Sequence, residues 1–348
     1  MVSGLALLVI GAEILVRAAV RLAASLKVRP LIIGLTVVAF GSSAPQMTVS
    51  LQATLAGNTD IAVGSVIGSS IFNILVTLGL SALIIPLRVS RQLVRLDIPA
   101  MILAGLLVFI LAANEKLTPA DGLVLLVALI AYLGVLHYQT RHSRRPRTLD
   151  TVARAPWLSS VLLMLVGLLI LVLAGHLLLG AAVDVASDLG LSERIIGLTL
   201  IGVGTSLPCL ATSLIAALRG QREIAVGNVI GSNLFNLLGV LGLTALLAPS
   251  PLSVSPNALD FDLPVMLAAV VLCLPMFYTG YRLTRAEGLV LLGLYLAYGL
   301  HVMSFTTGMA LANTLEQLML YYVLPALVAF LLLSTLRAWR RQRKRESQ

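Results

Sequence analysis

The sequence has few charged residues, few aromatic residues and almost no cysteine. Charged side chains make up 11% of the 348 residues, whereas soluble domains carry about 25%. A chain this poor in charge and 59% hydrophobic cannot cover a water-facing surface, which excludes an ordinary soluble protein. The two cysteines, Cys209 and Cys273, lie inside apolar runs and provide neither a disulfide framework nor metal-ligand spacing. The composition therefore predicts an all-α polytopic membrane protein.

The motifs of membrane enzymes are also missing. The sequence contains no intramembrane Ser/His pair, no His-Glu-x-x-His motif and no paired aspartates. The net charge of +9 does not indicate nucleic-acid binding, because the basic residues lie between apolar segments and at the C-terminus, without interleaved aromatic residues. We therefore expect no enzymatic activity, no cofactor and no nucleic-acid partner, and we expect contact with membrane lipids.

Apolar segments of membrane-spanning length follow one another along the chain. A transmembrane helix needs about 20 apolar residues to cross roughly 30 Å of hydrocarbon. Ten spans are predicted, at 2–24, 30–56, 61–86, 97–113, 120–138, 157–182, 194–218, 224–248, 262–280 and 286–304. An eleventh, 318–336, precedes a basic tail. The predicted units are 1–138, a basic cytoplasmic loop 139–156, a second unit 157–305, and an extra helix with the tail, 306–348.

The basic residues are distributed unequally between the two sides of these spans. With the N-terminus outside, the alternating loops place nearly all Arg and Lys on the cytoplasmic side and leave Lys116 and Arg194 outside. This is the positive-inside pattern of integral membrane proteins. It predicts a protein of a bacterial-type inner (plasma) membrane whose C-terminus lies in the cytoplasm.

The sequence also repeats itself, and the repeats share one offset of 163 residues, which carries Ile33 onto Ile196. The matching segments are 33–36 with 196–199, 41–46 with 204–209, and 61–73 with 224–236. Each half holds five predicted spans, and an odd number of crossings places the second copy upside down relative to the first. Two inverted five-helix repeats are typical of secondary transporters, in which the substrate site lies at the repeat interface near mid-membrane.

Polar residues recur inside the repeated spans. Pro45 and Pro208 stand about halfway along two of them, where we expect each helix to kink or unwind. The recurring polar residues nearby are Ser42, Ser43, Thr205, Ser206, Ser69, Asn73, Ser232 and Asn236. Their oxygens and freed backbone carbonyls are ligands that hard cations such as Na⁺ and Ca²⁺ prefer. The alternative is that these groups only hydrogen-bond between helices; for the whole symmetric set, an ion site is favoured.

On these motifs the chain resembles the sodium/calcium exchanger (cation/Ca²⁺ antiporter) superfamily, of the bacterial calcium/sodium antiporter type. The segments 33–85 and 196–248 are similar to its two alpha-repeats, and the likeness runs over the first 305 residues. The resemblance implies ion sites between the repeats and alternating access by sliding of spans one and six. It implies these ligand positions: Ala39, Ser42, Ser43, Gln46, Ser69, Asn73, Gly202, Thr205, Ser206, Cys209, Ser232 and Asn236.

The sequence departs from that family at two positions. Members of the family normally carry Glu after the repeat proline in both halves, where this chain has Gln46 and Cys209. The predicted site therefore contains no carboxylate, although a buried divalent ion usually needs anionic partners. Neutral oxygens hold a monovalent ion more readily than Ca²⁺, and a thiol matches hard cations poorly. Glu13, inside span one, is a further candidate, either as an ion ligand or in helix packing or gating.

Two functions remain open from the sequence. The first is a secondary cation antiporter that moves Ca²⁺ or another cation against Na⁺ or H⁺, with K⁺ as a further candidate. The second is a transport-inactive homologue that serves as a regulatory or assembly partner, since both family glutamates are absent. A passive channel is disfavoured, because inverted repeats suit alternating access better than a continuous pore. The sequence leaves the cation, the stoichiometry, the direction and the oligomeric state open.

Overall fold

The protein was analysed as a computed structural model, which describes residues 2–142, 156–188, 201–278, 280–307, 314, 317, 318 and 322. The helices of the first half are α1 (Val2–Leu26), α2 (Pro30–Ile33), α3 (Ala39–Leu55), α4 (Thr59–Phe72), α5 (Gly79–Ile84), α6 (Ile98–Leu111) and α7 (Pro119–His142). Its π-helical turns are η1 (Gly34–Val38), η2 (Asn73–Leu78) and η3 (Leu93–Asp97), with a 3-10 turn η4 (Ala112–Asn114). Two short strands, β1 (Leu87–Arg88) and β2 (Lys116–Leu117), complete this half.

The second half follows the same plan. Its helices are α8 (Trp157–Asp188), α10 (Ile201–Leu218), α11 (Arg222–Leu234), α12 (Leu241–Leu247), α13 (Leu263–Tyr278) and α14 (Arg285–Thr307). The π-helical turns are η7 (Phe235–Val240) and η8 (Ala258–Asp262), and the strands are β3 (Leu252–Ser253) and β4 (Arg282–Leu283). Turns η2 and η7 thus follow α4 and α11, and η3 and η8 precede α6 and α13, so the local irregularities recur in both halves.

A helix lies at each of the first ten predicted spans, and the molecule is mostly helical. Among the described residues, seven helices are long and apolar enough to cross a membrane. They are Pro30–Leu55, Thr59–Ile84, Leu93–Asn114, Pro119–Thr140, Trp157–Ala181, Arg222–Leu247 and Ala258–Tyr278. The predicted eleventh span, 318–336, lies almost entirely outside the described residues, as does the first part of the seventh. The all-α prediction missed the four two-residue strands, which are too short to leave a periodic pattern in the sequence.

The two intramembrane prolines do not unwind their helices, contrary to the expectation from the sequence. Helix α3 runs through Pro45 and α10 runs through Pro208 without a break. A proline removes one backbone donor, and transmembrane helices tolerate this where hydroxyl groups and neighbouring helices satisfy the carbonyls nearby. In α3 the Ser42 hydroxyl donates to the Ala39 carbonyl at 3.1 Å, and in α10 the Ser206 hydroxyl donates to the Gly202 carbonyl at 2.9 Å. These hydroxyls bond within the turn before each proline, while the carbonyls that lose their amide donors to Pro45 and Pro208 are those of Gly41 and Gly204.

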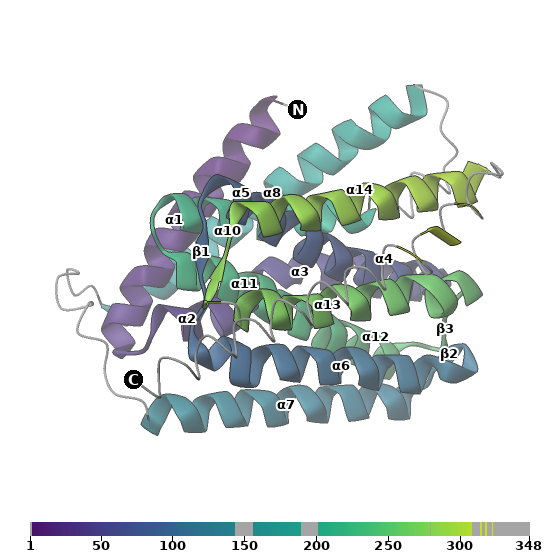
Figure 1. The fold of residues 1–348 in the computed structure, drawn as a ribbon, viewed down its shortest axis with the longest axis horizontal. Coiled ribbons are helices and arrows are strands. Elements are labelled where there is room, and N and C mark those ends of the chain that lie inside the picture. Colours follow the sequence, from purple (N-terminus) through teal and green to yellow (C-terminus); the bar gives the residue numbers. More distant parts are fainter. Residues whose placement is uncertain are drawn as a thin grey trace.

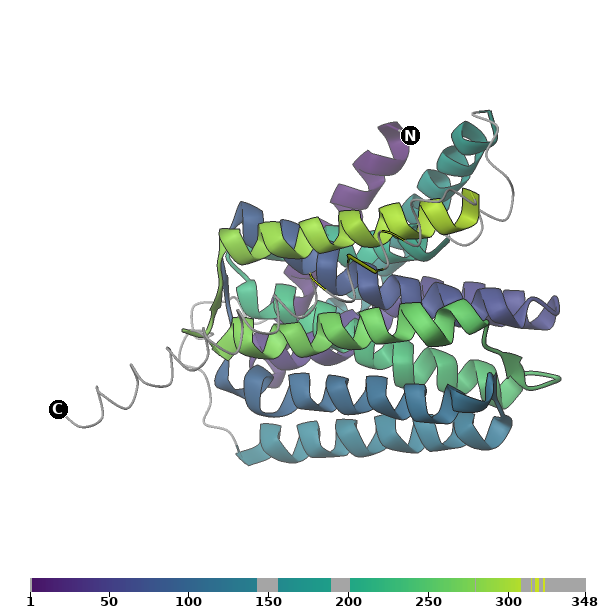
Figure 2. The same cartoon turned by 45° about the vertical axis from the view of Figure 1, so that its right-hand side comes forward.

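Helices α3, α4, α10 and α11 pack against one another and form the centre of the bundle. The spans Thr59–Ile84 and Arg222–Leu247, which contain α4 and α11, are the most buried of the candidate membrane spans. Helices α1 and α8 pack closely as a pair at the side, inclined to the other long helices and extending beyond them (Figures 1 and 2). Their backbones nearly touch, since a Cβ on Gly167 would lie 2.9 Å from the Leu15 nitrogen.

Two small ladders join loops of the first half to loops of the second. Strand β1 pairs antiparallel with β4, and β2 pairs antiparallel with β3. The ladders lie at opposite ends of the bundle (Figure 1). Strands β1 and β3 hold corresponding places in the two halves: β1 follows η2 and α5, and β3 follows η7 and α12. These corresponding strands thus lie at opposite ends of the molecule.

Close glycine contacts also join the halves. Helix α5 packs on α14, where a Cβ on Gly288 would lie 2.7 Å from the Gly79 carbonyl oxygen. Helix α12 packs on α7, where a Cβ on Gly122 would lie 2.6 Å from the Gly242 carbonyl oxygen. Real Cβ atoms essentially never approach an oxygen this closely, so both contacts require glycine. Gly227 and Gly231 of α11 likewise approach the backbone of residues 31–35 closely.

We predict that Gly122→Ala destabilises the protein. The added methyl group would lie 2.6 Å from the Gly242 carbonyl oxygen and 2.8 Å from the Leu246 nitrogen, both backbone atoms that cannot rotate away. Overpacking of this kind costs about 1–3 kcal/mol. Thermal unfolding of the purified protein in detergent should show a lower apparent Tm. The matched control is Gly134→Ala in the same helix, where no described atom lies within 4 Å of the new Cβ, and an unchanged Tm for both variants would contradict the prediction.

Candidate ion site

The twelve ligand positions implied by the sequence are all buried, and they lie on the four central helices and the turns that follow them. Ala39, Ser42, Ser43 and Gln46 are on α3, Ser69 is on α4 and Asn73 begins η2. Gly202, Thr205, Ser206 and Cys209 are on α10, Ser232 is on α11 and Asn236 is in η7. Hydrogen bonds within the set, across the two halves or within one half, involve ten of the twelve positions, all but Asn73 and Asn236.

One group of contacts centres on Ser42 of α3. Its hydroxyl lies 2.8 Å from the Ser232 hydroxyl and donates to Oδ1 of Asn228 at 2.9 Å, both on α11. The next hydroxyl along α3, that of Ser43, donates to the Ser232 backbone carbonyl at 3.4 Å. The Cys209 thiol of α10 lies 3.7 Å from the Ser232 hydroxyl. One end of the polar cluster is thus held by α3 from the first half and by α10 and α11 from the second.

A second group of contacts centres on Gln46 and Ser69. The Thr205 hydroxyl donates to Oε1 of Gln46 at 2.5 Å, and the Ser69 and Ser206 hydroxyls lie 2.5 Å apart. Both contacts join the first half to α10 of the second. The amide nitrogen of Gln46 donates to Ser65 at 2.9 Å and to Ser50 at 3.1 Å. Every polar atom of the Gln46 side chain is therefore used by the protein itself.

The second half contains a matching amide that the sequence analysis did not single out. Asn228 is fully buried, and its amide nitrogen donates to Ser213 at 2.9 Å and to the Cys209 carbonyl at 3.2 Å. The repeat offset pairs Asn228 with Ser65 and Cys209 with Gln46. In the first half the amide (Gln46) is on the proline-containing helix α3 and the small side chain (Ser65) is on α4. In the second half the small side chain (Cys209) is on the proline-containing helix α10 and the amide (Asn228) is on α11. The 163-residue repeat offset could have identified Asn228, because it occupies the same place in the second copy as Ser65 in the first.

Two candidate oxygens remain without a protein partner. Oδ1 of Asn73 and Oδ1 of Asn236 are both buried, and neither accepts a hydrogen bond within the described part of the chain. Both residues lie in π-helical turns, which are common at functional sites. An unpaired amide oxygen in a buried place costs about 1–3 kcal/mol. Amide carbonyls are good ligands for hard cations, so these two oxygens are chemically suited to a cation.

The site has no negative charge. None of the twelve residues is acidic, and no cluster of three or more His, Cys, Asp or Glu residues that could hold a metal occurs in the described regions. Buried charge needs an opposite charge or a full set of dipoles to compensate its desolvation. Hydroxyl, amide and backbone oxygens provide dipoles alone, so the arrangement suits a monovalent ion better than a divalent one.

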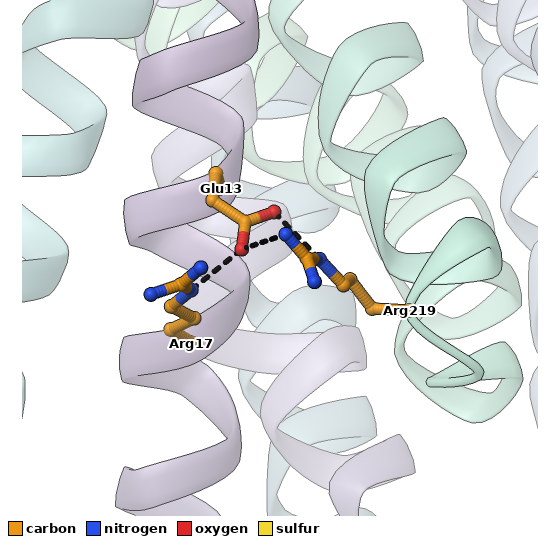
Figure 3. A network of polar contacts seen from close by, with 3 residues as sticks. All are labelled: Glu13, Arg17 and Arg219. Carbon is orange, nitrogen blue, oxygen red and sulfur yellow. Dashed lines mark hydrogen bonds and ion pairs between the residues drawn. The ribbon is translucent and has the colours of Figure 1, made fainter.

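Glu13 is held by arginines rather than pointing freely toward a ligand. Its Oε1 lies 2.5 Å from Nε of Arg17 and 2.8 Å from an Nη of Arg219, and its Oε2 accepts from Nε of Arg219 at 3.0 Å (Figure 3). Arg219 directly follows α10, ten residues after Cys209, or about 15 Å along a helix. The carboxylate therefore joins α1 to the end of α10, and both of its oxygens are engaged.

We predict that Asn228→Ala lowers stability by about 1–3 kcal/mol, because it removes a buried amide that bonds Ser42, Ser213 and the Cys209 carbonyl. Unfolding by increasing denaturant in mixed micelles measures the change. The matched control is Asn58→Ala, since Asn58 is exposed and its side chain does not cap α4. Equal stability of the two variants would show that the Asn228 contacts contribute nothing.

Three comparisons with known proteins agree with one another. The model of the family described as "Sodium/calcium exchanger protein" matches residues 1–138 and 159–304. CaxA of Alkalimonas amylolytica is 39% identical over 85% of this chain and 95% of its own length. The inner membrane protein YrbG of Escherichia coli (strain K12) is 36% identical over 86% of this chain and 94% of its own length.

A solved structure shows the same fold. The sodium-calcium exchanger NCX_Mj superposes with a TM-score of 0.73 at 30% identity, covering 85% of this chain and 95% of the exchanger chain. The family match and this superposition both extend over the two halves that carry the polar cluster. The protein is therefore an integral membrane protein that belongs to the sodium/calcium exchanger family.

Proposed function

We propose that the protein is a secondary cation antiporter that works by alternating access, with an ion site that contains no carboxylate. The observation that carries the proposal is the buried polar cluster between α3, α4, α10 and α11, in which hydrogen bonds join the two halves. A site whose lining is shared by two halves can open to one side when the halves shift relative to each other. The relatives that match this chain include a protein described as a sodium-calcium exchanger.

We infer that the two halves are inverted repeats of five spans each. Three features support this. The first two are the 163-residue sequence offset and the position of the corresponding strands β1 and β3 at opposite ends of the bundle. The third is that a helix of each half packs against the last described helix of the other half, through the Gly79–Gly288 and Gly122–Gly242 contacts. With the N-terminus outside, the basic loops and tail fall on the cytoplasmic side. This orientation suits a bacterial-type inner membrane, where a relative is also found.

The transported cations are proposed from the chemistry of the ligands. The unpartnered oxygens of Asn73 and Asn236 are neutral, and so are the hydroxyls around them. Na⁺ or K⁺ loses less hydration energy than Ca²⁺ on entering such a site, so a monovalent ion is the preferred ligand. Membership of the sodium/calcium exchanger family makes Ca²⁺ a candidate substrate. We expect Ca²⁺ to bind weakly to this chain, because no carboxylate balances its second charge.

One observation favours the alternative that the chain does not transport. The amide nitrogens of Gln46 and Asn228 donate within the protein, and each amide oxygen already accepts a hydrogen bond, which uses one of its two lone pairs and leaves less for an ion. A cluster that satisfies itself can hold the two halves together without any cation. In that case the chain is a regulatory or assembly partner of the same fold.

Flux measurements in vesicles distinguish these functions. Purified protein is placed in liposomes, and ²²Na⁺ exchange and Na⁺-driven ⁴⁵Ca²⁺ uptake are measured on the same preparation. We expect Na⁺ exchange above that of empty liposomes and little Ca²⁺ uptake. The absence of coupled flux for Na⁺, K⁺, Ca²⁺ and H⁺ would rule out the antiporter.

We predict that restoring the two family carboxylates creates Ca²⁺ transport. The double variant Gln46→Glu with Cys209→Glu places two anionic ligands in the site, and about 1.4 kcal/mol of added binding energy already raises affinity tenfold. Ca²⁺ uptake should therefore rise by roughly tenfold or more. The control is Gln52→Glu, an exposed position on the same helix. Unchanged Ca²⁺ uptake in a folded double variant would contradict the role given to these positions.

We predict that the Glu13–Arg219 ion pair affects the rate of transport and not the affinity for the ion. Both arginines are more than half exposed, so loss of the pair is worth about 0.2–1 kcal/mol, or up to roughly fivefold in rate. Glu13→Gln and Arg219→Gln should change kcat for Na⁺ exchange alike and leave KM unchanged, with the exposed Glu115→Gln as control. A raised KM in Glu13→Gln alone would instead identify Glu13 as an ion ligand.

A further inference from the structure

A carboxylate outside the candidate ion site is buried near the start of the span Leu93–Asn114. Asp97 is the last residue of η3, and its side chain is 0% exposed. Its Oδ1 accepts a hydrogen bond from the Tyr132 hydroxyl of α7 at 3.0 Å. Its Oδ2 is buried and has no hydrogen-bond partner in the described part of the chain. An acidic residue inside a membrane span is expected to have a function.

The Asp97 carboxylate has neutral hydrogen-bonding neighbours and one cation that acts on it only through space. The groups that act on Asp97 are Tyr132, the neighbouring Gln92 amide and, through space, the Arg29 guanidinium. Arg29 is already paired with Glu223 at 3.2 Å. No ion pair to Asp97 is found within the described ranges, and no other ionisable group on the elements packed around it acts on it. An ionised Asp97 would be a fully buried charge whose neighbouring donors, Tyr132 and the Gln92 amide, are both neutral, which costs several kcal/mol.

The second half contains the same arrangement with its bonds completed. Asp262 is the last residue of η8, and it accepts hydrogen bonds from the Tyr298 hydroxyl at 3.0 Å and from the Asn257 amide at 3.3 Å. Both of its oxygens are thus engaged, and its side chain is only partly buried. An amide, a carboxyl and a phenol therefore recur together in both halves. At Asp97 the burial is complete and one oxygen has an unused lone pair.

We propose that Asp97 binds a proton on Oδ2, so that H⁺ is a ligand of this protein at a site separate from the candidate ion site. A hydronium ion of the solvent gives up the proton: one of its O–H bonds breaks, an O–H bond forms on Oδ2, water is released and the side chain becomes neutral. The new hydroxyl can donate to the carbonyl oxygen of Gln92 after a half-turn of that amide, since amide oxygen and nitrogen occupy interchangeable positions.

A metal ion fits this place less well than a proton. Hard metal cations bind several oxygens at once, whereas the oxygens close to Asp97 are its own carboxylate, one phenol and one amide. A proton needs one lone pair, and Oδ2 has it. The inference goes beyond the proposed function, because it holds whichever cation the protein exchanges and whether or not it exchanges one.

Infrared spectroscopy of the full-length protein in lipid vesicles at neutral pH tests the proposal. A protonated carboxyl has a C=O stretching band that a carboxylate lacks. We expect this band in the wild type and its loss in Asp97→Asn, with the band retained in the matched variant Asp262→Asn. Tyr132→Phe should keep the band but shift it, because Oδ1 loses its hydrogen bond.

The proposal is overturned if Asp97→Asn has the same carboxyl spectrum as the wild type, or if the band is lost in Asp262→Asn instead. Should Asp97→Asn fail to give monodisperse protein, Tyr132→Phe decides the matter, since an unshifted band in that variant overturns the proposal. The measurement does not depend on transport. A failure of the vesicle flux experiments therefore leaves this result unaffected, and the two proposals can fail separately.

Discussion

The absence of water inside a membrane is the constraint on which the rest of this structure depends. A buried polar group there must find its partner within the protein or in a bound ion. In this chain some of the partners come from the opposite half: Thr205 donates to Gln46, and Ser42 donates to Asn228. The contacts that satisfy the polar groups are thus the same contacts that hold the two halves against each other. Any movement between the halves must exchange these bonds for others.

The same constraint explains how the two halves differ. At the position after the repeat proline, one half has Gln46 and the other has Cys209, which cannot reach as far. The amide of Asn228 reaches the Cys209 carbonyl and Ser213 from the neighbouring helix, much as Gln46 reaches Ser65 and Ser50. The requirement is for an amide in a particular space rather than at a particular sequence position. Each amide also accepts a hydrogen bond from a hydroxyl of the other half, Gln46 from Thr205 and Asn228 from Ser42. The two halves are therefore bonded to each other even though the amide lies on different helices in the two copies.

The first ten helices that the sequence predicted are present and its twelve candidate positions are buried, because both follow from patterns that are local or periodic, while ion binding at these positions stays a prediction. The spans follow from runs of apolar residues, and the twelve candidate positions follow from one repeat offset and a family resemblance. The continuity of α3 through Pro45 was not predictable in the same way, since it depends on how the neighbouring helices α4, α10 and α11 pack around that helix. The place of Asp97 was missed because the residue stands at the predicted edge of a span, where loop and buried helix look alike in sequence.

The neutrality of the cluster has a consequence for how a cation could be selected. A carboxylate attracts every cation and distinguishes them mainly by charge, whereas amide and hydroxyl dipoles distinguish them by the fit of the oxygens around the ion. Asn73 and Asn236 offer one unpartnered oxygen each from corresponding turns of the two halves. Their π-helical backbones differ from the regular helices on either side, so a small rotation of either half changes the position of its oxygen. Selectivity in such a site would depend on the relative position of the halves, and binding and conformational change would be coupled through the same two oxygens.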